Sequence, residues 1–304
     1  MPFMKILVLG GGNSAEREVS LRSSQSVQAG LTALGHDVVF RDAREDAAKI
    51  KQAAADCDLV FPILHGTGGE DGTIQRLLDQ TGTPYLGSGA EASALCFDKA
   101  KLISVIATAG VNVPAGELVT ADSFAQSPLT QRPFVLKPVA DGSTVGCYIA
   151  RQLPYDETKA MELLEHYGTM LLEELITGTE LTVPVLGEKA LPVIEIVPPQ
   201  GKEFDYENKY NGATAELCPP EHIAAADQAR AQRLAEKVHQ LAGARHLSRT
   251  DMILRPGGEL VVLEINTLPG MTSQSLYPKS AAVAGYSWTQ LLEQFIKLAS
   301  THNA

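Results

Sequence analysis

The N-terminal part of the chain alternates apolar runs with helical patterns, and this alternation constrains the fold more than any other feature. Residues 5–10 form a continuous apolar run, which is typical of a strand buried on both faces. A helix is predicted over residues 16–34 and is ended by Gly35, and the strand–helix order repeats through residues 36–82. Because strands that alternate with helices form parallel sheets, we expect an α/β fold with an N-terminal doubly wound parallel sheet over residues 1–95.

The remainder of the chain mixes helices and strands without regular alternation. With 304 residues the chain is long enough for two or three domains. A helix predicted over residues 93–109 and the short strand patterns after it indicate a small α+β domain at residues 96–178. Longer strand patterns and helices predicted over residues 221–242 and 287–299 indicate a second α+β domain at residues 179–304.

The composition of the chain limits the classes of binding partner and the cellular compartment that we expect. The formal net charge of −11 argues against a nucleic-acid surface or an anionic membrane as partner, because both are bound mainly through Lys and Arg. The four cysteines are widely spaced without a CxxC pair, so we expect four buried thiols in a reducing compartment. The apolar run after Lys5 is too short for a signal peptide, and no later run approaches a membrane span. We therefore expect a cytoplasmic protein.

Two polar pairs flank a turn in the C-terminal part of the chain. Arg249 and Asp251, like Glu264 and Asn266, are two residues apart on apolar strand patterns, so the members of each pair share a face. The turn at residues 256–258 predicts a hairpin, which would bring Asp251, Glu264 and Asn266 together. Three oxygen ligands suit Mg²⁺, and a nearby guanidinium suits a phosphoryl group in transfer. The alternative is a charged, solvated hairpin face.

A glycine-rich turn after the first strand allows two interpretations. Residues 10–15 fit the pattern G-x-G-x-x-A, which with Asp42 as the ribose ligand is typical of dinucleotide binding. The signal is weak, because any tight strand-to-helix turn favours glycine. Glu16, in the first helical turn, would repel a pyrophosphate. It either binds a substrate ammonium or complements the helix dipole.

Three further loops carry candidate ligand-binding residues. His65 begins a loop with four glycines in eight residues at the end of the third strand, where α/β sheets bind ligands. Lys137 ends a strand before residues 138–146, which form either a hairpin turn or a phosphate lid with Lys99 as a second cation. The loop at residues 205–210 carries two tyrosines and a lysine, and is typical of a lid or a disordered segment.

With these motifs in place, the chain closely resembles the D-alanine–D-alanine ligases of the ATP-grasp superfamily over nearly all its length. The resemblance rests on six motifs in order, at residues 14–20, 65–72, 137–146, 205–210, 249–251 and 264–272. It implies a three-domain ATP-grasp fold in which two α+β domains clasp ATP. The implied activity is ATP-dependent ligation of two D-alanines through a D-alanyl phosphate, for peptidoglycan precursor synthesis. The resemblance also implies a homodimer.

The resemblance assigns a nucleotide and metal site. ATP would be held by phosphate-binding lysines, a lid, an adenine-binding hinge and a ribose ligand, namely Lys99, Lys137, Lys209, Ser143, Glu173, Glu174, Leu175, Ile176 and Glu180. Two Mg²⁺ or Mn²⁺ ions would be held by Asp251, Glu264 and Asn266, with Glu264 shared by both. Glu174 stands where several members of the family carry Lys, and Thr144 where a second Ser is common.

The resemblance also assigns substrate-binding and catalytic residues. Glu16 would bind the ammonium of the first D-alanine, while Ser275 and Leu276 would receive the carboxylate of the second. Arg249 and the Gly270 amide would stabilise the oxyanion of the tetrahedral intermediate. A hydrogen-bonded triad would close the site, formed by Glu16, Ser143 and Tyr210. A further substrate-binding residue would be His65.

The rival interpretation is a nicotinamide-dependent oxidoreductase built on residues 10–15 and Asp42. It leaves the polar set of the predicted hairpin and the lid after Lys137 unexplained. In the ligase interpretation, Asp42 is an ordinary strand-end residue whose replacement should matter little.

Overall fold

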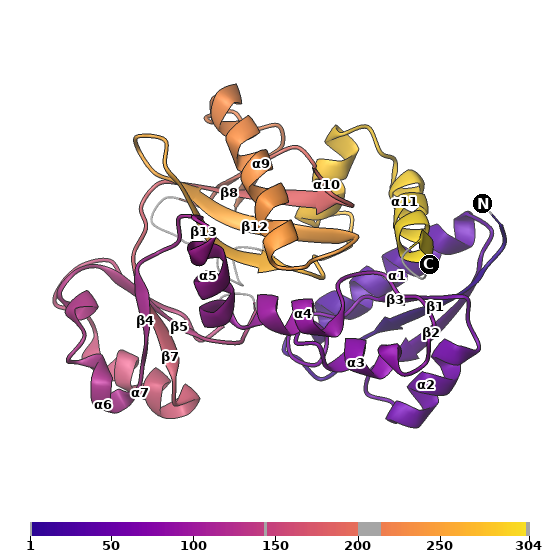
Figure 1. The fold of residues 1–304 in the computed structure, drawn as a ribbon, viewed down its shortest axis with the longest axis horizontal. Helices are drawn as coiled ribbons and strands as arrows, with labels where there is room; N and C mark the ends of the chain where they lie inside the picture. Colours follow the sequence, from indigo (N-terminus) through magenta and orange to yellow (C-terminus); the bar gives the residue numbers. More distant parts are fainter. Residues whose placement is uncertain (1, 143–144, 200–213, 302–304) are drawn as a thin grey trace.

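The computed structural model describes residues 2–142, 145–199 and 214–301, which fold around three β-sheets (Figure 1). The N-terminal sheet is parallel with the strand order β2-β1-β3, as the alternation of strands and helices predicts. Its strands are β1 (Lys5–Gly10), β2 (Asp37–Asp42) and β3 (Leu59–Pro62), and its helices are α1 (Arg17–Ala33), α2 (Ala47–Ala55) and α3 (Thr73–Asp79). The segments after β1 and β3, which carry Glu16 and His65, lie at the same edge of the sheet.

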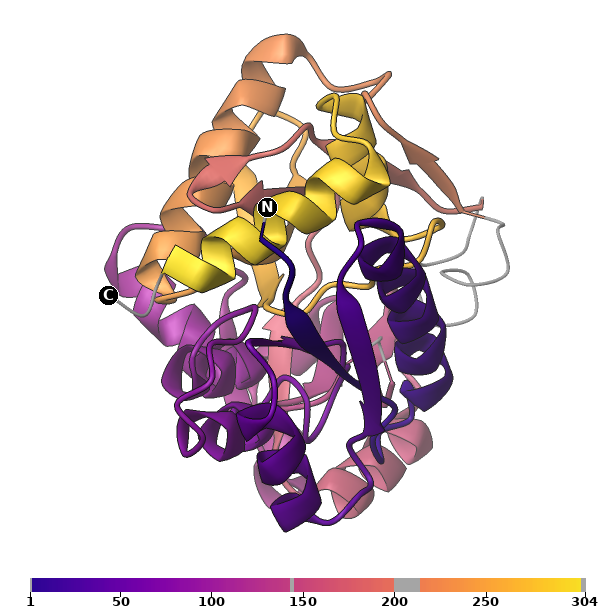
Figure 2. The ribbon, with the colours of Figure 1, turned by 90° about the vertical axis from the view of Figure 1, so that its right-hand side faces the viewer.

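The last helix, α11 (Trp288–Thr301), packs against α1 and ties the C-terminal part of the chain to the N-terminal sheet (Figure 2). The contact is close at Gly30, because a Cβ there would lie 2.4 Å from the Leu292 side chain and 2.5 Å from that of Trp288. Leu292 is fully buried in one cluster with Leu31 of α1. The N-terminal core is therefore completed by the C-terminal helix.

Between the first two sheets, the single helix predicted over residues 93–109 is in fact two helices, α4 (Ala90–Phe97) and α5 (Lys99–Thr108). Asp98 separates them, with an extended backbone (ψ 95°) and a carboxylate that accepts a hydrogen bond from the Lys101 N–H. Asp98 is therefore the N-cap of α5, a position at which Asp is favoured. Its extended backbone also ends α4. The break makes Lys99 the first residue of α5.

The central sheet is antiparallel, with the strand order β4-β7-β5-β6. Its core includes Phe124, Phe134 and Tyr155, whose rings meet edge to face with centroids 5.1 to 5.7 Å apart. The elements of this part are β4 (Gly116–Val119), α6 (Ala121–Phe124), η1 (Pro128–Gln131), β5 (Phe134–Pro138), β6 (Tyr148–Ala150), α7 (Glu157–Tyr167) and β7 (Met170–Glu174).

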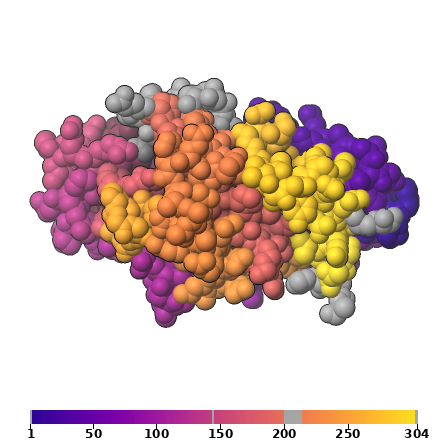
Figure 3. Space-filling view, turned by 90° about the horizontal axis from the view of Figure 1, so that it is seen from above, coloured from indigo at the N-terminus to yellow at the C-terminus, as the bar shows by residue number. Residues whose placement is uncertain are grey.

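The third sheet is antiparallel and carries the predicted hairpin. Its strands run in the order β11-β10-β8-β12-β13, with β9 paired to β8, and α9 packs against β8 and β12 (Figure 1). The elements are β8 (Thr179–Leu186), β9 (Lys189–Ala190), β10 (Ile194–Val197), β11 (Ala215–Leu217), α9 (Ala225–Leu241), β12 (Leu247–Leu254) and β13 (Leu260–Asn266). Seen from above, this C-terminal part lies between the central part on the left and the indigo N-terminal part on the right (Figure 3).

A short helix, α10 (Leu276–Val283), follows β13 and is absent from our sequence-based expectations. It has only eight residues, and Pro278 lies within its first turn, so its pattern resembles a loop. The helix begins directly after Ser275. Its first turn therefore faces the region to which the second substrate was assigned.

The cysteines are less buried than expected. All four are free, but Cys96 alone is buried, while Cys57, Cys147 and Cys218 are partly exposed. The expectation of four buried thiols is wrong for these three, because each lies beside a helix or strand and not within it. None of the helices in the described part of the chain is long and apolar enough to cross a bilayer.

Candidate active site

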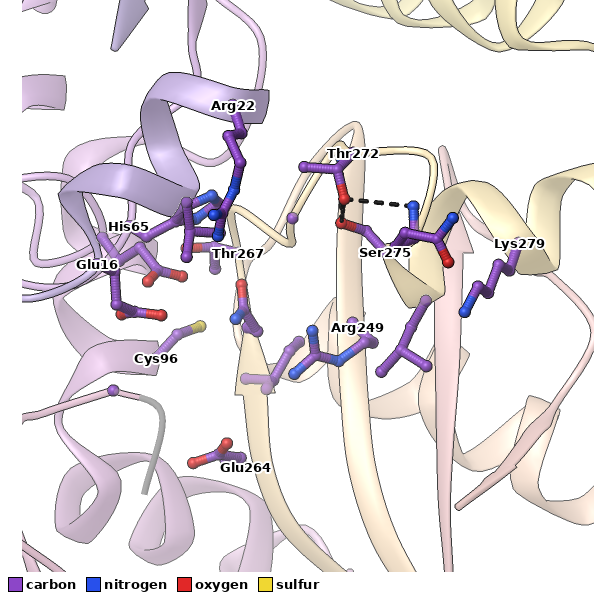
Figure 4. A pocket seen from close by; sticks show the side chains of 18 of the residues that line it. Glu16, Arg22, His65, Cys96, Arg249, Glu264, Thr267, Thr272, Ser275 and Lys279 are labelled. Atoms are coloured by element: carbon purple, nitrogen blue, oxygen red, sulfur yellow. Dashed lines mark hydrogen bonds between the residues drawn. The ribbon is translucent and has the colours of Figure 1, made fainter. Parts of the chain in front are cut away.

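A cavity of about 730 Å³ opens between β13, the start of α1, the α4–α5 junction and α10 (Figure 4). Nine of the residues singled out from the sequence line it, namely Glu16, His65, Lys99, Arg249, Glu264, Asn266, Gly270, Ser275 and Leu276. Glu16 and His65 enter from one side, and Lys279 enters from the opposite side (Figure 4). The fold thus brings together residues that lie far apart in the sequence.

The β12–β13 hairpin gathers the polar residues as its spacing predicts. Asn266 pairs with Arg249 and Glu264 pairs with Asp251, so all four lie on one face of the sheet. The register shifts directly after Asp251, which leaves the two polar pairs in regular pairing. The alternative of a solvated hairpin face is wrong, because Arg249 and Asp251 have side chains only 11% and 13% exposed.

Arg249 and Asp251 form a two-pronged ion pair. The Arg249 Nε and Nη2 atoms donate to the Asp251 Oδ1 and Oδ2 atoms at 2.9 and 2.8 Å. The Thr182 hydroxyl on β8 donates to the same carboxylate. Burial alone would lower the pKa of Arg249, but the nearby carboxylates, Asp251 foremost and Glu264 after it, together raise it. The site therefore contains a permanent, desolvated positive charge.

The oxygen donors of the hairpin fit a hard divalent cation by their chemistry. In the described ranges, no group of three or more His, Cys, Asp or Glu side chains is placed to hold a metal, so an amide oxygen must complete any such set. Asn266 offers one, since its Oδ1 accepts a 3.0 Å hydrogen bond from Leu268 and keeps a second lone pair. Asp251, whose two oxygens accept hydrogen bonds from Arg249 and Thr182 in this structure, and Glu264, which has Lys99 Nζ at 3.6 Å, would supply the charge. Mg²⁺ prefers such oxygen ligands.

Glu16 and His65 form the opposite wall. The Glu16 carboxylate lies close over two glycines, because a Cβ at Gly66 or Gly142 would be 3.2 or 2.6 Å from its Oε2. Burial lowers the pKa of His65, so its ring is neutral, and its Nδ1–H donates to the Leu268 carbonyl at 3.0 Å. The His65 Nε2 then presents a lone pair that has no hydrogen-bond partner among the described residues.

Glu70 is a buried acid within the motif at residues 65–72, and no role is predicted for it from the sequence. It lines the cavity, and its Oε2 accepts a 2.7 Å hydrogen bond from the Gly66 N–H. Burial first, and then the nearby Glu16 carboxylate, raise the pKa of Glu70 to about 8. Glu70 is therefore neutral at pH 7.

Most of the residues assigned to ATP lie beside the cavity on or next to the central sheet, whereas Lys99 begins α5 and lines the cavity, and Glu180 lies on β8 of the third sheet. Lys137 is buried and its Nζ lies 2.6 Å from the Glu173 carboxylate, which raises the pKa of Lys137 against the opposing effect of burial. Lys99 Nζ donates to the Asp141 carbonyl at 2.5 Å. Glu174 is paired with Arg255 at 3.1 Å, so its carboxylate is already engaged.

Not every assigned residue reaches the cavity. Seven lie outside its lining, namely Lys137, Glu173, Glu174, Leu175, Ile176, Glu180 and Asp251. Three more assigned residues lie outside the described residues, namely Ser143, Lys209 and Tyr210. Thr144 lies outside them as well. The triad of Glu16, Ser143 and Tyr210 therefore stays a prediction.

The cavity also contains polar residues that the sequence argument missed. On α1, Arg22 follows Glu16 at helical spacing through Val19 and continues to Ser26, so a helical-face analysis from Glu16 would have found it. On α10, Lys279 lies 2.5 Å from Glu216 of β11. No sequence pattern points to either residue of this pair. Lys279 lies on α10, which the sequence does not predict.

Asp42 does not have the setting of a ribose ligand. Its carboxylate receives Arg17 Nη1 and Nη2 at 3.0 and 2.6 Å, together with the N–H groups of Gly12 and Arg44. Asp42 is therefore more than an ordinary strand-end residue, while the expectation that its replacement matters little stays a prediction. The acceptor that a dinucleotide would need is occupied by the guanidinium of Arg17.

Comparisons with known proteins place the chain in a family. Residues 39–88 match the family model described as D-ala D-ala ligase N-terminus, and residues 105–297 match D-ala D-ala ligase C-terminus. A D-alanine–D-alanine ligase of Halalkalibacterium halodurans is 42% identical, and the match covers 97% of this chain and 99% of that one. The chain belongs to the D-alanine–D-alanine ligase family.

Solved structures of the D-alanine–D-alanine ligase family share the fold. A Bacillus anthracis ligase complexed with ATP has a TM-score of 0.84 at 28% identity, covering 99% of this chain and 98% of that chain. The VanG D-Ala:D-Ser ligase of Enterococcus faecalis has a TM-score of 0.82 at 30% identity, covering 98% and 100%. The three-domain ATP-grasp fold implied by the sequence is thereby confirmed, and the oxidoreductase alternative is wrong.

Proposed function

We propose that the protein is an ATP-dependent ligase that joins two D-alanines into D-alanyl-D-alanine for peptidoglycan precursor synthesis. The observation that carries this proposal is the cavity itself. Glu16 and His65 form one wall, and Arg249 and the first turn of α10 lie across from them (Figure 4). The cavity therefore offers an anionic site for an ammonium, together with cationic and N–H sites for carboxylates.

The first D-alanine would bind at the Glu16 wall. A protonated amine would donate to the Glu16 carboxylate, and the neutral His65 Nε2 would accept a further hydrogen bond. Because Glu70 is neutral at pH 7, it would not compete with Glu16 for the ammonium. The carboxylate of this substrate would then point towards β13.

ATP would approach from the central sheet. Its phosphates would be bound by Lys99 and Lys137, whose ammonium groups now face the carboxylates of Glu264 and Glu173. This role is supported by the ATP complex of the Bacillus anthracis ligase, which has the same fold. We also assign the segment from Glu173 to Ile176 to adenine and Glu180 to ribose, and we assign Ser143 and Lys209 to the phosphates.

Two Mg²⁺ or Mn²⁺ ions would be held by Asp251, Glu264 and Asn266. When bound, they would neutralise the charge that develops on the transferring phosphoryl group. The donor carboxylate attacks the γ-phosphorus, the bond to ADP breaks, and D-alanyl phosphate forms. The protein positions the two reactants for this step, and Lys99 and Lys137 offset the phosphate charge.

The second step would use the other end of the cavity. The amine of the second D-alanine loses a proton and attacks the acyl carbon, and phosphate leaves from the tetrahedral intermediate. Arg249 and the Gly270 N–H would stabilise its oxyanion. The second carboxylate would bind at Ser275 and Leu276, at the start of α10, whose N-terminus has no side-chain cap among the described residues.

A side chain at Gly270 would disturb this acceptor site. A Cβ at Gly270 would lie 2.9 Å from Ser275 Oγ, the atom that accepts a 3.0 Å hydrogen bond from the Thr272 N–H. Closure by the triad of Glu16, Ser143 and Tyr210 would exclude water, which hydrolyses acyl phosphates.

We further propose a cytoplasmic homodimer. The location is supported by four free thiols, which persist in a reducing compartment. The dimer is supported by the family resemblance.

The test is phosphate release with ATP, Mg²⁺ and a panel of D- and L-amino acids, D-serine and D-lactate, followed by identification of the product. The proposal predicts phosphate release with D-alanine alone and D-alanyl-D-alanine as the product. A mixed product with D-serine or D-lactate in the presence of D-alanine would assign a different acceptor. ATP binding without any product would contradict the enzymatic assignment.

A further inference from the structure

The turn that carries Glu16 is tied to the end of β2 by an ion pair next to the active site. Arg17, the residue after Glu16, donates from Nη1 and Nη2 to Asp42 Oδ1 and Oδ2 at 3.0 and 2.6 Å. The same Nη1 donates to the Gly12 carbonyl at 3.0 Å. Asp42 Oδ1 in turn accepts from the Gly12 N–H at 3.1 Å. Both backbone groups of Gly12 are therefore fixed by one side-chain pair.

The ion pair lies close against the backbone of the turn. Gly11 and Gly12 have φ angles of 75° and 79°, a backbone conformation that favours glycine. A Cβ on Gly11 would lie 2.6 Å from Asp42 Oδ1 and 2.7 Å from Arg17 Nη1. The ion pair thus packs directly on the Gly11 backbone, and the conformation of the turn depends on it.

Glu16 takes its position from the same turn. The Glu16 N–H donates to Ser14 Oγ at 3.3 Å, and the Arg17 N–H donates to the Ser14 carbonyl at 3.2 Å. On the cavity side, the Glu16 carboxylate lies close over Gly66 and Gly142. Any movement of the turn would therefore shift the Glu16 carboxylate within the cavity.

Charge favours the pair at neutral pH. The hydrogen bond from Arg17 holds the pKa of the Asp42 carboxyl well below its usual range, so Asp42 stays ionised. The two side chains are each 23% exposed, and a partly exposed pair of this kind contributes little to stability on its own. The role of the Arg17–Asp42 pair is therefore indicated by its position next to Glu16 and not by its contribution to stability.

We infer that Arg17 and Asp42 are positioning residues that fix the Glu16 carboxylate for the ammonium of the first D-alanine. The inference rests on the proposed function. In a dinucleotide-binding protein, an acidic residue at the position of Asp42 would bind the ribose. Here Asp42 has a different role. Misplacing a binding group by a fraction of an ångström weakens one substrate selectively, whereas a loss of stability affects all substrates alike.

The test measures each substrate constant in Asp42→Asn and Arg17→Met, with Arg17→Lys as the conservative variant. Hydroxylamine in place of the second amino acid attacks the acyl phosphate, releases phosphate and gives a hydroxamate, so the KM of the first D-alanine is read alone. We expect that KM to rise about ten-fold in both variants, with the KM for ATP changed less than about two-fold. Arg17→Lys should recover part of the loss.

Arg41→Gln is the matched control, since Arg41 precedes Asp42 and forms an exposed 3.8 Å pair with Glu45. It should leave all substrate constants unchanged. A double variant of Arg17 and Asp42 should raise the KM of the first D-alanine no more than the more impaired single variant does. The reason is that both side chains act through one contact.

Two outcomes overturn the inference, namely a lower Tm with an unchanged KM for the first D-alanine, or an equal rise in every substrate constant. If one of the variants Asp42→Asn and Arg17→Met does not fold, the other decides alone: an unchanged KM for the first D-alanine in the folded variant overturns the inference. If the wild type makes no hydroxamate and no dipeptide, the proposed function fails instead.

Discussion

Replacing Glu70 by Gln should change how the stability of the protein depends on pH. Glu70 is 7% exposed, and its neighbours in the cavity wall are Glu16, His65, Cys96 and Arg249. Its folded pKa of about 8 lies above the reference value of 4.5, so the native state binds this proton more tightly than the unfolded state does. The stabilisation is therefore complete below about pH 4.5 and is lost as pH rises towards 8.

The magnitude follows from the width of that window. Each pH unit between the two pKa values changes the free energy of unfolding by up to ~1.4 kcal/mol. Across the window this gives a swing of roughly 3 kcal/mol, allowing for about one pH unit of partial titration at the edges. Gln has a similar shape and no proton to lose. The stability of Glu70→Gln relative to wild type should therefore rise steadily from pH 5 to pH 8.5.

The assay is urea unfolding of wild type and Glu70→Gln at intervals between about pH 5 and 8.5. Glu91→Gln is the control, because Glu91 is an exposed carboxyl on α4 in the same part of the fold. The control should show no trend relative to wild type. Parallel pH curves for wild type and Glu70→Gln would refute the conclusion that Glu70 is neutral in the native protein.

Three other predictions concern the metal site, the packing of α11 and the acceptor. Glu264→Gln should leave the fold intact but reduce ligation to at most a few per cent, measured as phosphate release at ordinary Mg²⁺; higher turnover would count against Glu264 as a metal ligand. Gly30→Val should lower the free energy of unfolding by about 1–3 kcal/mol through overpacking against Leu292, measured in urea; an unchanged midpoint would be inconsistent with the close contact. Because an α-ammonium must lose a proton before attack, dipeptide formation should rise between about pH 6 and 9 while depsipeptide formation with D-lactate should not; depsipeptide as the main product above neutral pH would exclude D-alanine as the acceptor.

The sequence predicts those parts of the site that depend on local spacing. Arg249 and Asp251 share a face because they are two residues apart on a strand, and the turn at residues 256–258 pairs them with Asn266 and Glu264. The parallel N-terminal sheet is predictable for the same reason, because its strands and helices alternate regularly.

Features that depend on tertiary packing are missing from the sequence-based account. The interruption at Asp98 and the helix α10 were not predicted, because a capping Asp and a short helix with an early Pro resemble ordinary helix and loop patterns. The raised pKa of Glu70 requires burial beside Glu16, which only the fold provides. The Arg17–Asp42 pair joins residues from two elements, and no spacing rule predicts it.

The central claim, that the protein activates D-alanine as an acyl phosphate, is tested most directly by isotope transfer. The measurement uses D-alanine labelled with ¹⁸O in its carboxylate, together with ATP and Mg²⁺, and mass spectrometry of the phosphate and the dipeptide. A carboxylate oxygen attacks the γ-phosphorus and leaves with it, so the account predicts one ¹⁸O atom in each phosphate released and D-alanyl-D-alanine as the product. Unlabelled phosphate formed together with the dipeptide, or ATP hydrolysis without any dipeptide, would contradict it.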